Sequence, residues 1–412
     1  MEKLAEQALK HGGALGLVKG YVFTGNGTGN ITLEKNSKGD IVVSYRVCSY
    51  TFFSCRERIS YNLKTLWIPN MGEFPEHTFG STNVVGTLNK ETLCVENQRE
   101  YLSDINRGKN VYTGYEDVRL INWEGCMYAI TSKPFGLGDG RIPIAVSKLN
   151  EDYFVEKETL YIHQNVEKNW MPVESQPLTF LYTSVNPTNV ISCNDKEFLF
   201  SKTIETNEHV FYKGSTQVRE YKNHYIVLTH YNEETNVDDM FLYSYKHIFL
   251  KYDKDWNLVA KSEPFTFMDC SIEFACGLLI DGNDVYLTFS LYDNVAFVLR
   301  FGVDFLNYLF GSKKPDFKKQ NNSVGITYPK NENDMFSLCG DIAKANNFNG
   351  ALAMYMSLGA FTKDLKLAKD AYLEALWLVK QCKLSNNSDY ITMLLYEDRI
   401  IDQITRINKK LK

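Results

Sequence analysis

The chain has 412 residues, of which 44% are hydrophobic and 23% charged, and its formal net charge is -5. These values are ordinary for a folded protein, and the length allows two domains. Nucleic-acid-binding proteins usually carry a basic surface, so the slightly acidic balance argues against that class and we expect no nucleic-acid partner.

The cysteine pattern and the N-terminal residues restrict the class of protein further. The nine cysteines are scattered, and no C-x-x-C pair supplies the usual spacing of a zinc site. An odd number of cysteines in a long chain favours reduced thiols in a cytoplasmic protein. Residues 1–18 mix charges with glycine, and no run of 18 apolar residues occurs. The sequence therefore predicts no signal peptide and no membrane span, and we expect neither a metal nor a cofactor.

The first two thirds of the chain have the pattern of serial β-hairpins. After a short helix predicted over residues 3–11, short apolar or alternating runs are separated by Asn, Asp and Gly turns. Ile41–Tyr45 follows Asn36–Asp40, for example, and Val285–Ser290 follows Asp281–Asp284. A strand, a tight turn and a second strand are typical of a hairpin.

So many hairpins exceed what one β-sandwich of about 100 residues contains. Four-stranded units arranged radially hide their strand edges, so we predict a mainly β protein whose core is a five-bladed β-propeller. The predicted boundaries are an N-terminal segment over residues 1–19 and the propeller over residues 20–311. A two-domain β protein is the alternative architecture.

The last hundred residues have a different pattern. Residues 312–332 are polar and rich in lysine and asparagine, which is typical of a linker, and residues 333–412 are predicted to form a small α-helical domain. The expected helices cover residues 333–346, 348–358, 363–382 and 387–409. Gly340–Ala343 and Phe348–Ala351 resemble a tetratricopeptide helix pair. The domain could cap the propeller, mediate self-association or bind a protein partner, and the sequence leaves these alternatives open.

One segment, Gly114–Leu120, concentrates ionisable side chains at the start of a predicted strand. Strand alternation places Asp117 and Arg119 on one face and Glu116 on the other. A carboxylate beside an arginine stays ionised unless burial opposes it. The segment suits acid–base chemistry, although a surface turn with a salt bridge explains the same residues.

Other segments carry polar side chains suited to a sugar or a phosphate. Lys168 and Asn169 precede an aromatic residue and a proline, and Lys213 is a point charge beside the permissive Gly214. The upstream glycines of a P-loop are absent there. His230, Glu273 and Asp293 lie on or beside later predicted strands. Taken singly, each of these residues also fits a packed strand or a solvated turn.

In order and spacing, these segments resemble the inverting mannoside phosphorylases and hydrolases of glycoside hydrolase family 130 and the related β-1,2-mannosyltransferases. The resemblance runs over most of residues 28–302 and opens with Asn30 and Arg46. Gly114–Leu120 is similar to the family's Glu-Asp-Pro-Arg segment, with Val118 in place of proline, which implies that Asp117 is the general acid or base. The resemblance further implies substrate-binding roles for Arg46, Glu116, Arg119, Asn169, Glu273 and Asp293, and phosphate- or donor-binding roles for Lys168, Lys213 and His230.

Two departures from the family pattern affect the expected reaction. Asn186 precedes Pro187 where the family has a phosphate-binding arginine, and Lys168 replaces another arginine. Arginine forks hold a phosphate dianion better than lysine does. We therefore expect a hexosyltransferase more than a phosphorylase, acting on mannose, with a sugar phosphate or nucleotide-sugar as donor and a carbohydrate as acceptor. A non-catalytic glycan-binding propeller and a protein-interaction scaffold are the alternatives.

Overall fold

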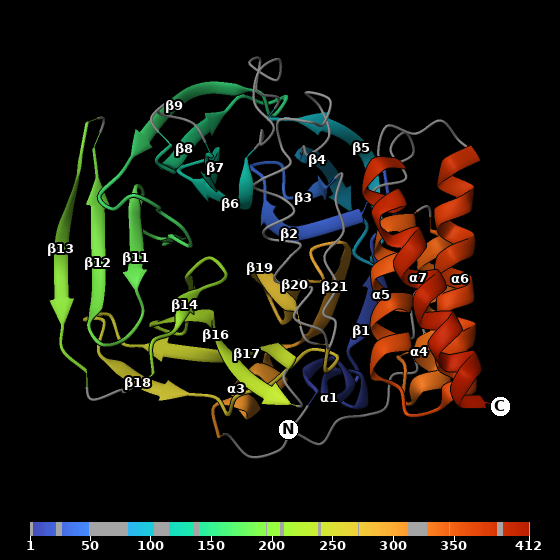
Figure 1. The fold of residues 1–412 in the computed structure, drawn as a ribbon. Helices are drawn as coiled ribbons and strands as arrows, with labels where there is room; N and C mark the ends of the chain where they lie inside the picture. Colours follow the sequence, from blue (N-terminus) through green and yellow to red (C-terminus); the bar gives the residue numbers. More distant parts are fainter. Residues whose placement is uncertain are drawn as a thin grey trace.

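A computed structural model describes residues 3–21, 27–48, 81–102, 115–134, 140–194, 196–206, 210–237, 240–270, 272–311, 328–345, 347–384 and 390–411. Strands dominate up to residue 302 and helices dominate after it. Five antiparallel sheets are arranged around a common centre, and the C-terminal helices stand at one side of them (Figure 1). The predicted five-bladed β-propeller with a C-terminal helical region is confirmed.

The blades follow one another in chain order. Blade one contains β2 (Gly27–Lys35), β3 (Ile41–Cys48), β4 (Ser81–Leu88) and β5 (Val95–Tyr101), and blade two contains β6 (Glu116–Trp123), β7 (Cys126–Ser132), β8 (Ile144–Leu149) and β9 (Val155–Tyr161). Blade three contains β10 (Met171–Pro172), β11 (Thr179–Thr183), β12 (Thr188–Cys193) and β13 (Phe198–Ile204). Blade four contains β14 (Lys213–Gly214), β15 (Arg219–Tyr221), β16 (His224–Val237), β17 (Met240–Tyr252) and β18 (Leu258–Lys261).

Blade five joins the two ends of the β region. It contains β19 (Glu273–Asp281), β20 (Asp284–Leu291) and β21 (Val295–Gly302), and its outer strand is β1 (Ala14–Leu17). Ala14 pairs with Arg300 and Leu17 pairs with Phe297. Residues 14–17, which the sequence assigned to the N-terminal segment, therefore belong to the propeller, and they close the ring of blades. The short helix α1 (Leu4–Lys10) precedes β1 and buries Leu4, Ala5 and Ala8 in the same core as blade five.

The turns form as their residue types predict. Asn36 accepts hydrogen bonds through its side-chain oxygen from the backbone N–H groups of Lys38 and Asp40, and Gly39 has a φ of +90°. An asparagine that bonds its own turn, followed by a glycine in the left-handed region, is a standard way to reverse a chain. Strand β3 begins directly after this turn, where the apolar run Ile41–Tyr45 predicted it.

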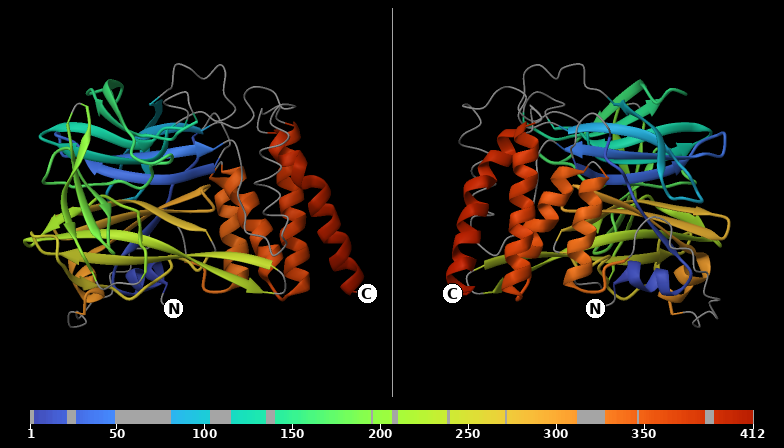
Figure 2. Two further views of the ribbon diagram at one scale, coloured as in Figure 1. Left: turned by 60° about the vertical axis from the view of Figure 1, so that its left-hand side comes forward. Right: turned by 90° about the vertical axis from the view of Figure 1, so that its right-hand side faces the viewer.

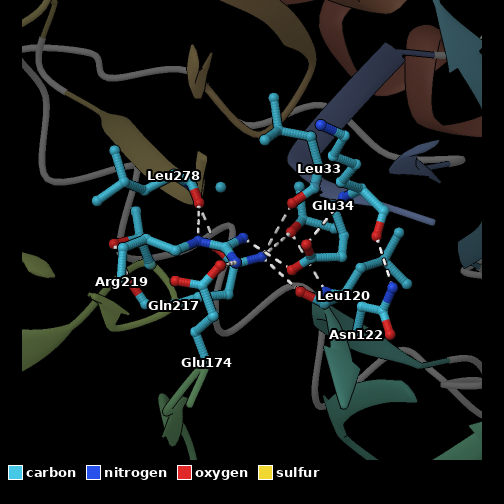
Figure 3. A network of polar contacts seen from close by, with 12 residues as sticks. Leu33, Glu34, Leu120, Asn122, Glu174, Gln217, Arg219 and Leu278 are labelled. Carbon is cyan, nitrogen blue, oxygen red and sulfur yellow. Dashed lines mark hydrogen bonds and ion pairs between the residues drawn. The ribbon is translucent and has the colours of Figure 1, made fainter. Parts of the chain in front are cut away.

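A buried ion-pair network joins all five blades (Figure 3). Arg219 of β15 lies 2.8 Å from Glu34 of β2 and 3.4 Å from Glu174, which follows β10, and it donates to the carbonyl of Leu278 on β19. Gln217 donates to the carbonyl of Leu120 on β6 at 2.6 Å. Arg219 and Gln217 are fully buried, so the blades meet at a polar and tightly connected centre.

The helical region packs on blade five. The short helix α3 (Val303–Leu309) ends the β region, and α4 (Glu332–Lys344), α5 (Phe348–Phe361), α6 (Leu365–Leu384) and α7 (Tyr390–Leu411) follow. Figure 2 shows α4 to α7 standing side by side next to the propeller. Ala351 and Leu352 of α5 share one hydrophobic core with Val295 and Phe297 of β21. In the described part of the chain, no helix is both long and apolar enough to span a membrane.

Candidate active site

The residue expected to be the acid or base, Asp117, lies at an irregular point of β6. The pairing of β6 with β7 shifts its register between Glu116 and Arg119, and Asp117 has a φ of +55°. Such a β-bulge re-aims side chains. The predicted alternation, with Glu116 on the opposite face from Asp117, is therefore wrong: both carboxylates face Arg46.

Arg46 of β3 and Lys168 bring positive charge to these carboxylates. A guanidinium nitrogen of Arg46 lies 3.4 Å from Glu116 and 4.0 Å from Asp117, and the arginine side chain is only 5% exposed. The Lys168 ammonium lies 3.3 Å from the other oxygen of Glu116. Burial opposes the charged form of Lys168, but the attraction of Glu116 and Asp117 outweighs it and raises the lysine pKa above its usual value. Glu116 thus bridges two cations that come from different blades.

Asn30 of β2 holds the Asp117 carboxylate in place. Its amide nitrogen donates to Oδ1 of Asp117 at 2.6 Å. The hydroxyl of Ser290 on β20 in turn contacts the backbone N–H and the side-chain oxygen of Asn30 at 3.1 and 3.2 Å. This positioning role was not predicted, because the sequence identified Asn30 only by its resemblance to the first-blade asparagine of the family.

Arg119 was expected to bind substrate, but its guanidinium is directed at the protein. It donates to the backbone carbonyls of Asp117 at 2.9 Å and Ser215 at 2.7 Å, and to the side-chain oxygen of Asn169 at 3.0 Å. The residue is 2% exposed. Arg119 therefore fixes Asp117 relative to Asn169, another predicted binding residue, and to blade four.

Asp293 belongs to the same cluster, although it lies 176 positions after Asp117 in the sequence. It occupies the turn between β20 and β21, with a φ of +55°. Burial raises its pKa to about 6; Asp117 and Glu116 add to the rise, and Arg46 and Lys168 oppose it. A β-carbon at Gly29 would lie 2.1 Å from the Asp293 carbonyl oxygen, so this glycine allows blade one to approach the turn closely.

Lys213 and His230 form a neighbouring pair on blade four. They lie opposite each other in the pairing of β14 with β16. The Nδ1 atom of His230 is 2.8 Å from the Ser215 hydroxyl, and burial, together with nearby positive charge, places the histidine pKa well below its usual value. His230 is therefore a neutral imidazole, and the charge that could attract a phosphate here is that of Lys213.

The Glu273 side chain is bound by a loop and not by the carboxylate cluster around Asp117. Its carboxylate oxygens accept hydrogen bonds from the backbone N–H groups of Phe267 at 2.5 Å, Met268 at 2.8 Å and Cys270 at 2.8 Å. The side chain is fully buried, which raises its pKa to about 7. The expected sugar-binding residue is thus the centre of a folded loop, residues 267–270.

The cluster combines groups suited to acid–base chemistry on a charged substrate. Three carboxylates (Glu116, Asp117 and Asp293) meet Arg46 and Lys168 where blades one, two, three and five converge. A carboxylate can move a proton to or from a sugar oxygen, and lysine can hold a phosphate. Within the described ranges, no group of three or more His, Cys, Asp or Glu side chains is placed to hold a metal ion.

Among known proteins, only solved structures are found to be similar to this chain. No family model and no curated protein matches the chain. It is similar to a β-1,2-mannobiose phosphorylase from Listeria innocua, with 10% identity, a TM-score of 0.47, and coverage of 72% of this chain and 93% of that one.

Two proteins from Leishmania mexicana are also similar, each with 10% identity and with coverage of 76% of this chain and 93% of theirs. One is a mannose phosphorylase, with a TM-score of 0.45, and the other is a GDP-Man-dependent mannosyltransferase, with a TM-score of 0.41. Mannoside phosphorylases and mannosyltransferases are also the proteins that the sequence motifs resemble.

Proposed function

We propose that the protein transfers a hexose with inversion of configuration, with Asp117 as the general acid or base. The observation that carries this proposal is the convergence of Asp117, Glu116, Asp293, Arg46 and Lys168 from four blades into one cluster. Inversion requires a carboxyl group at the transferred oxygen and the second reactant on the opposite face of the sugar.

The proposed reaction is a single displacement. Asp117 takes the proton of an acceptor hydroxyl while that oxygen attacks the anomeric carbon, and the bond to the donor phosphate breaks. Lys168 and Lys213 hold the departing phosphate oxygens, and Arg46 and Asp293 orient the sugar hydroxyls. Mannose is proposed from the motif resemblance. Transfer is favoured over phosphorolysis because His230 is neutral, Lys168 replaces one arginine of the family pattern, and Asn186 stands in place of another.

Replacing Asp117 by asparagine tests the assignment. Asparagine tolerates the left-handed backbone at this position, so Asp117→Asn removes the proton acceptor without straining the bulge. We expect kcat to fall by about 100-fold to 10,000-fold, with an unchanged melting temperature. The assay supplies mannose 1-phosphate or GDP-mannose with mannose as acceptor. Asp284→Asn, at the exposed first position of β20, is the matched control.

Three results would contradict the proposal. Full activity of Asp117→Asn would remove this residue from the mechanism. A wild-type protein that binds mannosides but forms no product with either donor would favour the alternative function, a non-catalytic glycan-binding propeller. A protein that binds neither sugar nor donor would favour the scaffold.

A further inference from the structure

A cavity lies where the propeller meets the helical region. Its volume is about 590 Å³, within the usual range of small-molecule sites. Residues from several distant segments line it: Lys3 at the N-terminus, Ser244 of β17, the loop with Met268 and Cys270, Tyr292, and residues of α4 and α5. In both views of Figure 2, the long hairpin of β16 and β17 extends from the propeller toward the helices.

Part of the lining of this cavity is apolar. Met268 and Met354 are 2% exposed, Leu358 is 8% exposed, and Met335 and Phe361 are half-buried. The lining also includes polar and charged residues: Ser244, Lys330, Asn331, Glu332 and Thr362. Methionine side chains are flexible and polarisable, so such walls adapt to apolar ligands of irregular shape. The charged residues Lys3 and Asp269 lie 3.8 Å apart with partly exposed side chains, which places them at the rim.

One polar group on the inner wall has no partner. The Ser357 hydroxyl of α5 makes no hydrogen bond within the described residues, and the residue is 4% exposed. A buried hydroxyl without a partner is costly and calls for an explanation. A ligand oxygen in the cavity would supply the missing partner.

The cavity and the carboxylate cluster share one turn. Tyr292 and Asp293 are consecutive residues, both in the left-handed region with φ of +52° and +55°. Tyr292 lines the cavity, whereas Asp293 interacts electrostatically with Asp117 and Arg46. Glu273 fixes the loop that carries Met268, another lining residue of the cavity. The turn thus has one residue in the cavity lining and the next residue in the carboxylate cluster.

We propose that this cavity takes the apolar aglycone of a glycoside whose sugar occupies the cluster around Asp117, with Ser357 bonding an aglycone oxygen. The inference rests on the proposed hexosyl transfer and names the class of the second reactant: an alkyl or aryl alcohol or its glycoside. Hydroxyls of a second hexose that faced Met268, Met354 and Leu358 would find no polar partner on those three side chains.

Calorimetric binding to the full chain tests this with three probes: mannose, β-1,2-mannobiose and octyl β-mannoside. We expect octyl β-mannoside to bind at least about tenfold more tightly than mannose, because part of the octyl chain leaves water. Met335→Trp should fill the cavity and abolish that gain without changing mannose binding. Phe336→Trp, at the next and similarly buried position of α4 but outside the cavity lining, should keep the gain.

Phe361→Ala is a second variant for the case in which Met335→Trp fails to fold. It removes part of the apolar wall without adding bulk, so it should also reduce the gain in affinity of octyl β-mannoside over mannose. Equal binding of mannose and octyl β-mannoside, or a larger gain with mannobiose, would overturn the aglycone site and leave the proposed function intact. A different result would instead overturn the proposed function. In that case no mannoside binds, whereas 1-octanol binds the wild type and Met335→Trp abolishes its binding.

Discussion

Four residues of the candidate site have left-handed backbone conformations. Asn30, Asp117, Asn169 and Asp293 have φ of 44°, 55°, 63° and 55°. Short Asn and Asp side chains adopt this region at lower cost than other residues with a β-carbon. The backbone therefore restricts these positions to the same residue types that the chemistry requires. Unfavourable backbone of this kind gathers at functional sites.

The sequence predicted most of the cluster but not what each member contacts. The resemblance to the family's motifs identified Asp117, Glu116, Arg46, Lys168 and Asp293 as site residues. The contacts depend on the bulge at Asp117, which breaks strand alternation and leaves no periodic signal in the sequence. The direction of Arg119 next to this bulge, and that of Glu273, which the loop 267–270 holds, have no periodic signal either.

Asp293→Asn is expected to make the free protein more stable than the wild type, by a margin that grows as the pH rises. The folded pKa of Asp293, about 6, exceeds the usual aspartate value, so ionising it in the folded state costs stability. Wild-type stability should fall as the pH rises from about 4 through 6, whereas asparagine does not titrate. Urea unfolding should show the advantage of the variant growing by about 1 to 3 kcal/mol between pH 4 and pH 7. A pH-independent difference, equal to that of the exposed control Asp284→Asn, would contradict this.

The inner strands provide both the irregularity and the rigidity of the site. Register shifts occur in β2 between Gly29 and Thr32, in β6 between Glu116 and Arg119, and in β19 between Ala275 and Gly277. The site residues Asn30 and Asp117 lie within the first two shifts. Nearby regular stretches carry the Arg219 network (Figure 3). The Arg219 network thus connects the blades close to the register shifts that shape the carboxylate cluster.

Arg219→Met tests how much this network stabilises the propeller. Arg219 and Glu34 are both buried, and removing one partner of a buried pair costs about 3 to 5 kcal/mol because the other charge stays uncompensated. Burial already raises the pKa of Glu34, and Arg219 opposes that rise. Without Arg219 the folded pKa rises further, so the loss should be larger at pH 8 than at pH 5.

The double variant Arg219→Met/Glu34→Gln is the matched control. It removes the unpaired carboxylate of Glu34, so it should recover at least about 1 kcal/mol of the lost stability. Urea unfolding at the two pH values should also show that most of the pH dependence of the loss disappears. A single variant that costs less than about 1 kcal/mol, or a double variant no better than the single, would show that the network contributes little to stability.

At the scale of the whole molecule, the order of elements was predictable but their long-range partners were not. Turn residues mark most strands, and the helical pattern after residue 332 is confirmed. The pairing of β1 with β21 joins segments at opposite ends of the propeller and has no local signal. The packing of α5 on blade five likewise depends on apolar faces that any neighbour could cover.

Asn347 connects the helical region to the candidate site. It caps α5 by accepting a hydrogen bond from the Gly350 N–H at 2.8 Å, and its amide nitrogen donates to the carbonyl of Asn294 at 2.6 Å and lies 3.3 Å from the Thr28 hydroxyl. The side chain is fully buried. Asn294 directly follows Asp293, so the first turn of α5 supports the turn that carries a predicted sugar-binding carboxylate.

Asn347→Ala should therefore weaken both folding and ligand binding. We expect a loss of about 1 to 3 kcal/mol in the free energy of unfolding, from the lost cap and the lost hydrogen bond to the Asn294 carbonyl, which then keeps only the Thr28 N–H as a donor. The affinity for mannose 1-phosphate should also fall, because the Asp293 turn loses its support. Asn331→Ala is the matched control, since Asn331 caps α4 by accepting from the Asp334 N–H and is exposed. It should cost about 1 kcal/mol and leave sugar phosphate binding unchanged. If both variants lost stability yet bound the sugar phosphate like the wild type, the helices would stabilise the propeller without supporting its site.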